Sequence, residues 1–181
     1  IEEAVVTGHN ILILGAAGTG KSFLVKKLFN TLKTKKTTQL TASTGIAASN
    51  IEGVTIHKFM GLLDGRYHNE EITTKIINEE RFLHVKERLQ KVECIIIDEI
   101  SMLSLKTFLQ IEYILRGVKQ NSLPFGGVQI ILSGDFFQLK PVANPRYNDP
   151  GDLVISYNKF SDLVPHHFIL TEVFRQKEGM P

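Results

Sequence analysis

The sequence predicts one α/β domain, in which helices cover both faces of a mainly parallel sheet. Short apolar runs at residues 11–14, 94–97 and 128–132 are typical of strands that are buried on both faces, as in parallel sheets. Segments with a helical spacing of apolar residues alternate with these runs, notably at 23–33 and 105–118. A length of 181 residues, with 43% hydrophobic and 22% charged residues, suits one well-buried domain.

The first apolar run leads into a glycine-rich loop. The loop consists of Gly15, Ala16, Ala17, Gly18, Thr19, Gly20, Lys21 and Ser22. A strand, a GxxxxGK[ST] segment and a helix form the pattern of a phosphate-binding loop, whose backbone N–H groups wrap a polyphosphate. Lys21 is expected to bind the β- and γ-phosphates, and Ser22 to ligate Mg²⁺. The alternative, a turn that only joins strand to helix, is disfavoured by the complete motif in this context.

Composition limits the class of protein. No apolar run approaches the ~20 residues that cross a bilayer, and the N-terminus shows no basic segment followed by an apolar core and a cleavage site. We therefore expect an intracellular protein that is neither secreted nor membrane-bound. The single cysteine, Cys94, begins an apolar run and is expected to be a small buried residue. The net charge of +2 does not by itself indicate a nucleic-acid partner.

A second turn from strand to helix follows the first. Residues 1–8 resemble the tail of a helix, and the helix after the glycine-rich loop is expected to end near residue 33. A threonine-rich strand at 37–41 leads to Thr44 and Gly45, which precede a short helix. These two residues could contact the phosphates of a nucleic-acid strand or form an ordinary N-cap, and this stretch alone slightly favours the N-cap.

The next segment combines a basic, an imidazole and an aromatic side chain. His57, Lys58 and Phe59 lie within residues 53–62, and such a mixture suits contact with a nucleic-acid backbone and stacking on bases. An amphipathic helix with Phe59 in the core and a hydrogen-bonded His57 explains the same residues equally well. Residues 64–78 are largely polar and predict a surface excursion without chemistry.

Two carboxylates follow the next strand. A helix expected over residues 80–91 leads into the apolar run that ends in Asp98 and Glu99. Downstream of a phosphate-binding loop, Asp98 is expected to hold Mg²⁺, and Glu99 to orient or deprotonate the attacking water. An exposed strand end would explain the pair without chemistry, but its combination with the loop disfavours that alternative.

A third polar cluster arrives at the same edge of the sheet. After the helix at 105–118 and a turn at 124–127, the strand at 128–132 leads to Gln138, a candidate γ-phosphate sensor. Carboxyl ends of parallel strands are where α/β proteins bind ligands. A loop containing proline and asparagine follows at 141–150.

The end of the chain adds a candidate arginine. A short helix near 157–163 and a strand at 168–170 lead to Arg175, which is either an arginine finger or an exposed surface side chain. His166 and His167 lack the spacing of metal ligands, so no zinc site is predicted.

The order of these segments carries a resemblance to a known family. The chain contains, in sequence, GAAGTGKS, TASTGIAA, TIHKFMG, IIIDEISM, PFGGVQIILSGDFFQL and LTEVFRQ. Together they resemble the petite-integration-frequency family of DNA helicases in superfamily one, and the match covers nearly the whole chain. The most specific part, from Phe108 to Gln129, looks like the family's signature segment between the Walker B strand and the third helicase motif.

The resemblance implies a P-loop NTPase with a RecA-like fold that uses ATP and Mg²⁺ to move 5′ to 3′ on single-stranded DNA, in DNA repair or recombination. Such helicases close two RecA-like domains on the nucleotide. Residues 1–181 resemble the first, N-terminal domain, and the second is absent from this chain. The implied ATPase residues are Lys21, Ser22, Asp98, Glu99, Gln138 and Arg175. The implied DNA contacts are Thr44, Gly45, His57, Lys58 and Lys140.

Two other classes of function are weighed against this one. A P-loop ATPase that moves protein or RNA is disfavoured by the TIHKFMG and PFGGVQ segments. A module that binds nucleotide or DNA without turnover should lack a catalytic carboxylate, yet Glu99 is present. In a eukaryote, the resemblance implies a nuclear or mitochondrial protein; the oligomeric state is not indicated.

The chain departs from the family pattern at three points. Lys140 and Pro141 stand where the family usually has two prolines, so an added cation is expected beside the DNA path. The glutamine that reads adenine in such helicases would lie upstream of Ile1. Since the second domain is also absent, this chain alone is expected to bind nucleotide weakly and to unwind nothing.

Overall fold

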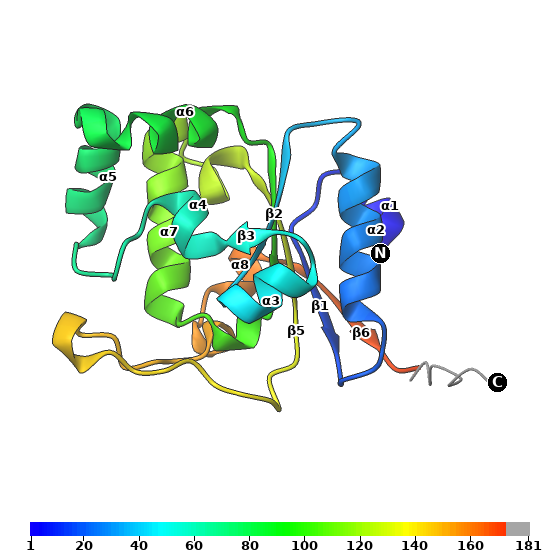
Figure 1. Ribbon diagram of the computed structural model, residues 1–181. Coiled ribbons are helices and arrows are strands. Elements are labelled where there is room, and N and C mark those ends of the chain that lie inside the picture. Colours follow the sequence, from blue (N-terminus) through cyan, green and yellow to red (C-terminus); the bar gives the residue numbers. More distant parts are fainter. Residues whose placement is uncertain (173–181) are drawn as a thin grey trace.

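The computed structural model describes residues 1–172, whose strands form one sheet of six parallel strands (Figure 1). The strand order is β3-β2-β4-β5-β1-β6. The strands are β1 (Ile11–Gly15), β2 (Thr38–Ala42), β3 (Val54–Thr55), β4 (Cys94–Asp98), β5 (Gln129–Gly134) and β6 (His166–Leu170). The predicted parallel α/β sheet is therefore confirmed.

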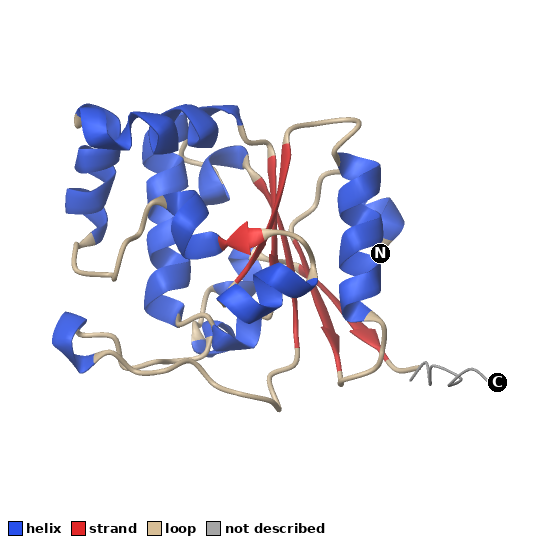
Figure 2. Ribbon diagram, in the orientation of Figure 1, coloured by secondary structure: helices blue, strands red, loops and turns tan. Residues whose placement is uncertain are grey.

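Helices cover both faces of the sheet, as predicted (Figure 2). The α-helices of the described residues are α1 (Glu2–Val6), α2 (Lys21–Leu32), α3 (Gly45–Asn50), α4 (Ile56–Met60), α5 (Asn69–Asn78), α6 (Leu83–Lys91), α7 (Leu105–Lys119) and α8 (Phe160–Leu163). Short 3₁₀ turns lie at Glu80–Phe82, Ile100–Met102, Pro124–Gly127, Pro145–Tyr147 and Val154–Ser156. In Figure 1, α1 and α2 lie on one side of the sheet, and α5, α6 and α7 on the other. None of these helices is both long and apolar enough to cross a membrane.

Alternation along the central strands gives the domain two cores. In β4, Cys94 and Ile96 belong to the core under α2, whereas Ile95 and Ile97 belong to the larger core under α7. Every residue of β4 is buried. Because burial contributes about 25 cal/mol per Å² of apolar surface, a strand covered on both faces stabilises the fold more than an edge strand does.

The segment 64–78, for which only a polar surface excursion was predicted, contains α5. Ile72 and Ile76 lie four residues apart on this helix and are buried, and α5 packs against α7. Two isoleucines at helical spacing are enough to bury one stripe while the remaining positions stay polar. The helix was not predicted, because the average polarity of the segment concealed this stripe.

The helix α7 extends through Gly117 and ends at Lys119, one residue beyond the predicted range 105–118. A Cβ on Gly117 would come within 2.6 Å of Thr73 Cγ2, so the glycine permits the close approach of α5 and α7. Gln120, the residue after the helix, takes a left-handed backbone with φ of 50°.

Strand register brings the predicted site residues to one edge of the sheet. Ala42 of β2 pairs with Asp98 of β4, and Leu14 of β1 pairs with Gly134 of β5. The segments that follow these strands therefore emerge side by side. Open parallel sheets bind their ligands at this carboxyl edge.

Candidate functional site

The loop after β1 is a compact turn into α2. Gly18 and Gly20 have φ of 81° and 84°, a left-handed backbone that favours glycine. At Gly15 the constraint is space, because a Cβ there would lie 2.5 Å from Thr19 Oγ1. The Thr19 hydroxyl donates to the carbonyl of Ala16 at 2.7 Å. The loop thus delivers the unpaired N–H groups of the first turn of α2 to the carboxyl edge of the sheet.

Lys21 is folded back over this loop. Its Nζ donates to the carbonyl oxygen of Gly15 and, at 3.0 Å, to that of Ala16. The residue is only 9% exposed. A polyphosphate wrapped by the loop would meet this ammonium group directly.

Ser22 and Asp98 join the start of α2 to the end of β4. Ser22 Oγ donates to Asp98 Oδ2 at 3.4 Å, and the N–H of Glu99 donates to Asp98 Oδ1 at 2.9 Å. Burial raises the pKa of Asp98, whereas hydrogen bonds to its carboxylate lower that pKa. A hydroxyl and a carboxylate oxygen suit Mg²⁺ in company with phosphate oxygens. Within residues 1–172, no group of three or more His, Cys, Asp or Glu side chains could hold a metal ion on its own.

Glu99 lies in a strained turn that Ser43 holds in place. Its backbone is left-handed, with φ of 54° and ψ of 45°, which is uncommon for glutamate and is found at functional sites. Ser43 Oγ donates to the Glu99 carbonyl at 2.6 Å, and the Ser43 N–H donates to the Asp98 carbonyl at 3.1 Å. Burial and the neighbouring Asp98 raise the pKa of the Glu99 carboxyl, which suits a group that accepts a proton.

Sequence reasoning missed Ser43. The signal was available, because this serine lies in the Ser-Thr-Gly turn directly after β2. Its hydrogen bonds to the Asp98–Glu99 peptide segment depend on the register between β2 and β4, which the sequence alone does not reveal.

Gln138 follows β5 at the same edge but is exposed. The N–H of Phe137 donates to Asp135 Oδ1 at 3.0 Å, and the N–H of Gln138 donates to the Asp135 carbonyl at 3.2 Å. The Gln138 side chain makes no hydrogen bond within the described part of the chain. Arg175 lies outside the described residues, so its expected role stays a prediction.

Thr44 caps α3, as the N-cap alternative predicted. Its Oγ1 accepts a hydrogen bond from the N–H of Ala47 at 3.2 Å. Gly45 has open space around its Cα, where an added Cβ would meet nothing within 4 Å. The packing of the domain therefore does not require glycine at this position.

The three candidate residues on α4 have different environments. Phe59 is 6% exposed and belongs to the core, so the amphipathic-helix alternative is correct for this residue. Lys58 is exposed, and His57 is half-buried at the wall of a cavity. Burial lowers the pKa of His57, so its imidazole is neutral at pH 7.

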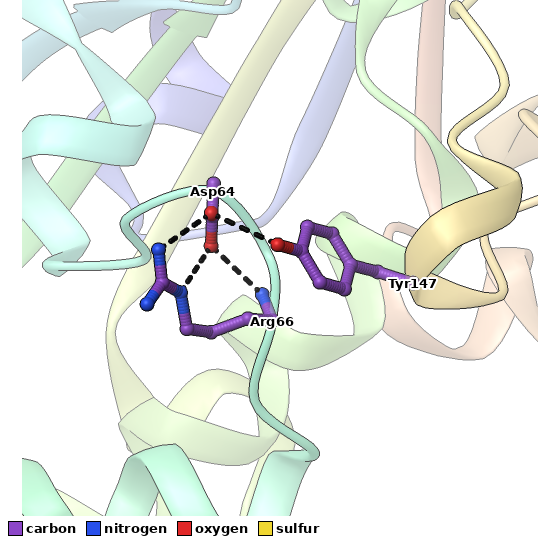
Figure 3. Close-up of polar contacts among 3 residues, drawn as sticks. All are labelled: Asp64, Arg66 and Tyr147. Carbon is purple, nitrogen blue, oxygen red and sulfur yellow. Dashed lines mark hydrogen bonds and ion pairs between the residues drawn. The ribbon is translucent and has the colours of Figure 1, made fainter.

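This cavity, of about 360 Å³, joins Thr44 and His57 to the loop 141–149, for which the sequence predicted no role. Tyr147 holds that loop in place: its hydroxyl donates to Asp64 Oδ2 at 3.2 Å, and Lys106 Nζ donates to its carbonyl. Arg66 pairs with the same carboxylate at 2.8 Å and lowers the pKa of Asp64 (Figure 3). Asp64 and Tyr147 are 83 residues apart, so their pairing is a result of the tertiary fold.

Comparison with known proteins identifies the family. The model of the family described as PIF1-like helicase matches residues 1–180. The chain belongs to this family. It is 37% identical over 173 residues to the ATP-dependent DNA helicase PIF1 of Saccharomyces cerevisiae (strain YJM789). That match covers 94% of this chain and 20% of the yeast protein, so the chain spans about a fifth of that relative.

Solved Pif1 helicases share the fold of this PIF1-like chain. The crystal structure of Pif1 helicase from Candida albicans matches with a TM-score of 0.88 and 33% identity, over 98% of this chain and 39% of that one. The Pif1 helicase from Bacteroides in complex with ADP-AlF₃ and single-stranded DNA matches with a TM-score of 0.76 and 32% identity, over 98% and 42%. The RecA-like fold implied by the motifs is confirmed.

The stability of this PIF1-like domain is expected to fall as the pH drops below about 6.5, because of His57. An unfolded histidine has a pKa near 6.5, and burial lowers the pKa of His57 in the fold. The unfolded chain therefore binds more protons between these two pKa values, so the free energy of unfolding decreases as the pH falls through that window. Urea unfolding at several pH values should show a weaker pH dependence for His57→Gln than for the wild type. His84→Gln is the control, because His84 is exposed and its loss should leave the pH dependence unchanged. If the free energy of unfolding depends on pH equally in the wild type and in His57→Gln, the prediction is contradicted.

Proposed function

We propose that residues 1–181 are the N-terminal RecA-like motor domain of an ATP-dependent DNA helicase that moves 5′ to 3′ on single-stranded DNA. The observation that carries the proposal is the grouping of Ser22, Asp98 and Glu99 beside the glycine-rich loop, where the Ser22 hydroxyl and the Glu99 N–H both face the Asp98 carboxylate. This set combines a metal-binding pair with a candidate base, which a mere nucleotide-binding module does not need. The yeast relative is named an ATP-dependent DNA helicase, which agrees with this proposal.

In the proposed mechanism, the backbone of the loop wraps the phosphates of ATP and Lys21 binds the β- and γ-phosphates. Ser22 and Asp98 would hold Mg²⁺, which when bound neutralises the charge that develops on the phosphate oxygens. Glu99 orients the attacking water and accepts its proton. Gln138 senses the γ-phosphate, and Arg175, outside the described residues, supplies a further positive charge.

Single-stranded DNA is the proposed partner at the neighbouring strand ends. The proposed contacts are Thr44, Gly45, His57, Lys58 and Lys140. Thr44 and His57 line one cavity, which supports their grouping. A neutral His57 would act as a hydrogen-bonding or stacking group rather than as a counterion. A second RecA-like domain of the same parent protein would complete the site, in the nucleus or mitochondria if the source is a eukaryote.

The deciding experiment measures ATP hydrolysis by the parent protein with and without single-stranded DNA. Strong stimulation by DNA supports a DNA motor, and unwinding of a duplex with a 5′ tail but not a 3′ tail supports the proposed direction. An absence of stimulation would contradict DNA translocation and favour a P-loop ATPase with another substrate. The isolated 181-residue chain should separate no strands, because strand separation requires both domains.

Lys140→Pro, which introduces the residue usual in the family, is expected to weaken DNA binding in a salt-dependent way. Lys140 is exposed after β5, so its ammonium is available to a phosphate. Each phosphate contact contributes about 0.7 to the slope of log K against log salt for single strands. The slope for the parent protein should therefore fall by about that amount in a fluorescence anisotropy titration.

Two further variants separate charge from backbone effects at this position. Lys140→Ala should change the salt slope in the same way as Lys140→Pro. Lys91→Ala is the matched control, because Lys91 is exposed at the end of α6, before β4 begins at the opposite edge of the sheet. An unchanged slope in both Lys140 variants would remove this residue from the proposed DNA contacts.

A further inference from the structure

Two buried hydroxyl groups within residues 1–172 have no hydrogen-bond partner, and both lie near the carboxylates of the proposed ATP site. They belong to Ser101, which is 1% exposed, and Ser133, which is 0% exposed. The large majority of buried polar side-chain atoms are hydrogen-bonded, and an unpartnered one destabilises the fold. A buried hydroxyl without a partner beside a ligand site therefore suggests that it forms its hydrogen bond when the nucleotide is bound.

Strand register puts Ser133 next to Asp98. Ile97 of β4 pairs with Leu132 of β5 in the parallel ladder. The residues that follow, Asp98 and Ser133, are therefore neighbours across these two strands. Ser133 stands at the end of a central strand, where its hydroxyl is shielded from water.

Both side chains also lie on the face of the sheet that α2 covers. Side chains alternate along a strand, so residues two apart share a face. Ile96 and Ile131, two residues before Asp98 and Ser133, both belong to the core under α2. Since α2 begins beside the glycine-rich loop, Ser133 and Ser22 approach the Asp98 carboxylate from different elements on one face.

Three donor groups lie around the Asp98 carboxylate, and only one of them forms a hydrogen bond of ordinary length. The N–H of Glu99 donates to Oδ1 at 2.9 Å, but the Ser22 hydroxyl lies 3.4 Å from Oδ2, beyond the usual range for such a bond. The Ser133 hydroxyl, at the neighbouring position of β5, forms no hydrogen bond within the described residues. A donor for the carboxylate is thus present but not engaged.

We propose that Ser133 is a positioning residue that orients the Asp98 carboxylate for the magnesium ion of a bound nucleotide. Its hydroxyl donates to Asp98 in the nucleotide-bound state and so holds the carboxylate toward Ser22. This inference rests on the proposed function, because it takes Ser22 and Asp98 as the metal-binding pair. Since Gln138 lies in the segment that follows β5, Ser133 also ties this carboxylate to the strand that leads to the proposed γ-phosphate sensor.

The test measures binding of a fluorescent ADP analogue, mant-ADP, to the 181-residue chain as the Mg²⁺ concentration is varied. Ser133→Ala is expected to raise the Mg²⁺ concentration for half-maximal enhancement of binding by about tenfold, as is typical when a partner of a metal ligand is lost. Binding of mant-ADP in EDTA should match the wild type. The midpoint of thermal unfolding without ligand should be unchanged or higher, because the variant removes an unpartnered buried hydroxyl.

Thr41→Val is the matched control for a buried hydroxyl near this site. Thr41 is also 0% exposed, but its Oγ1 donates to the carbonyl of Ile96 at 2.7 Å. Its neighbours in β2, Leu40 and Ala42, belong to the core under α2, so Thr41 faces the opposite side of the sheet. This variant should lower the unfolding midpoint and leave the Mg²⁺ dependence unchanged, the reverse of the pattern expected for Ser133→Ala.

The outcomes separate this inference from the proposed function. An unchanged Mg²⁺ dependence in Ser133→Ala would overturn the inference and leave the proposed function intact. The same holds if Ser133→Ala loses affinity equally with Mg²⁺ and with EDTA, since that result indicates a packing role. A wild-type chain whose mant-ADP binding does not respond to Mg²⁺ would overturn the proposed metal site, and the inference with it.

Discussion

Glu99→Gln is expected to lower DNA-stimulated ATP hydrolysis by the parent protein by about 10²- to 10⁴-fold, the usual contribution of a general base. Glutamine keeps the size and the hydrogen-bonding reach of the side chain but cannot accept a proton from water. Burial and Asp98 both raise the pKa of the Glu99 carboxyl, which brings it closer to the range of an effective base. The affinity for ATP should be retained, because Glu99 is not among the proposed phosphate or metal ligands.

The backbone at Glu99 should survive this substitution. Its N–H donates to Asp98 and its carbonyl accepts from Ser43, and neither bond uses the side chain. Glu52→Gln is the matched control, since Glu52 is an exposed glutamate with a similar left-handed φ of 59°. Steady-state hydrolysis should fall for Glu99→Gln alone, whereas both variants should unfold at the wild-type temperature. Hydrolysis at the wild-type rate in Glu99→Gln would exclude Glu99 as the base.

Lys21→Met is expected to weaken ATP binding about 100-fold. Hydrogen bonds from charged groups contribute about 1.5–3 kcal/mol each, and the lysine is proposed to contact two phosphate groups. In the structure its ammonium is already held at the loop by the carbonyls of Gly15 and Ala16, so little reorganisation precedes phosphate binding. Methionine preserves the length and apolar packing of the stem but removes the charge.

Titration with a fluorescent ATP analogue in the presence of Mg²⁺ measures the effect of Lys21→Met. Lys26→Met is the control, because Lys26 lies on the same helix and has no proposed contact with nucleotide. Circular dichroism should show that both variants keep the α/β fold. If Lys21→Met binds ATP as tightly as Lys26→Met does, the proposed role of the loop lysine is wrong.

Much of the fold could be predicted because its strongest signals are local. The apolar runs of β1, β4 and β5 are continuous and short, which is typical of central parallel strands. The helix α5 was missed, because only Ile72 and Ile76 mark its buried stripe within a polar segment. The end of α7 was predicted to within one residue, although Gly117 serves the approach of another helix rather than a C-cap.

The residues of the candidate site likewise fall into those that a local motif predicts and those that only the tertiary structure places. The glycine-rich loop and the Asp98–Glu99 pair are each contiguous, and each residue type is required by the chemistry at its own position. For Phe59, by contrast, the sequence favoured stacking on bases and packing in the core equally. Only the packing of α4 in the folded domain places this side chain in the core. Part of the wall of the His57 cavity comes from loop 141–149, which was predicted as a loop but without a role in the site.

The sequence by itself determined the parallel α/β class, the motifs of the ATP site and the family resemblance, because these depend on residue types at short, fixed spacings. The tertiary structure decided which side chains meet. Ser22 reaches Asp98 across 76 residues, and Ser43 reaches Glu99 across 56. Such contacts depend on strand register and on which face of the sheet each helix covers, and both are set by packing of the whole domain rather than by any local pattern.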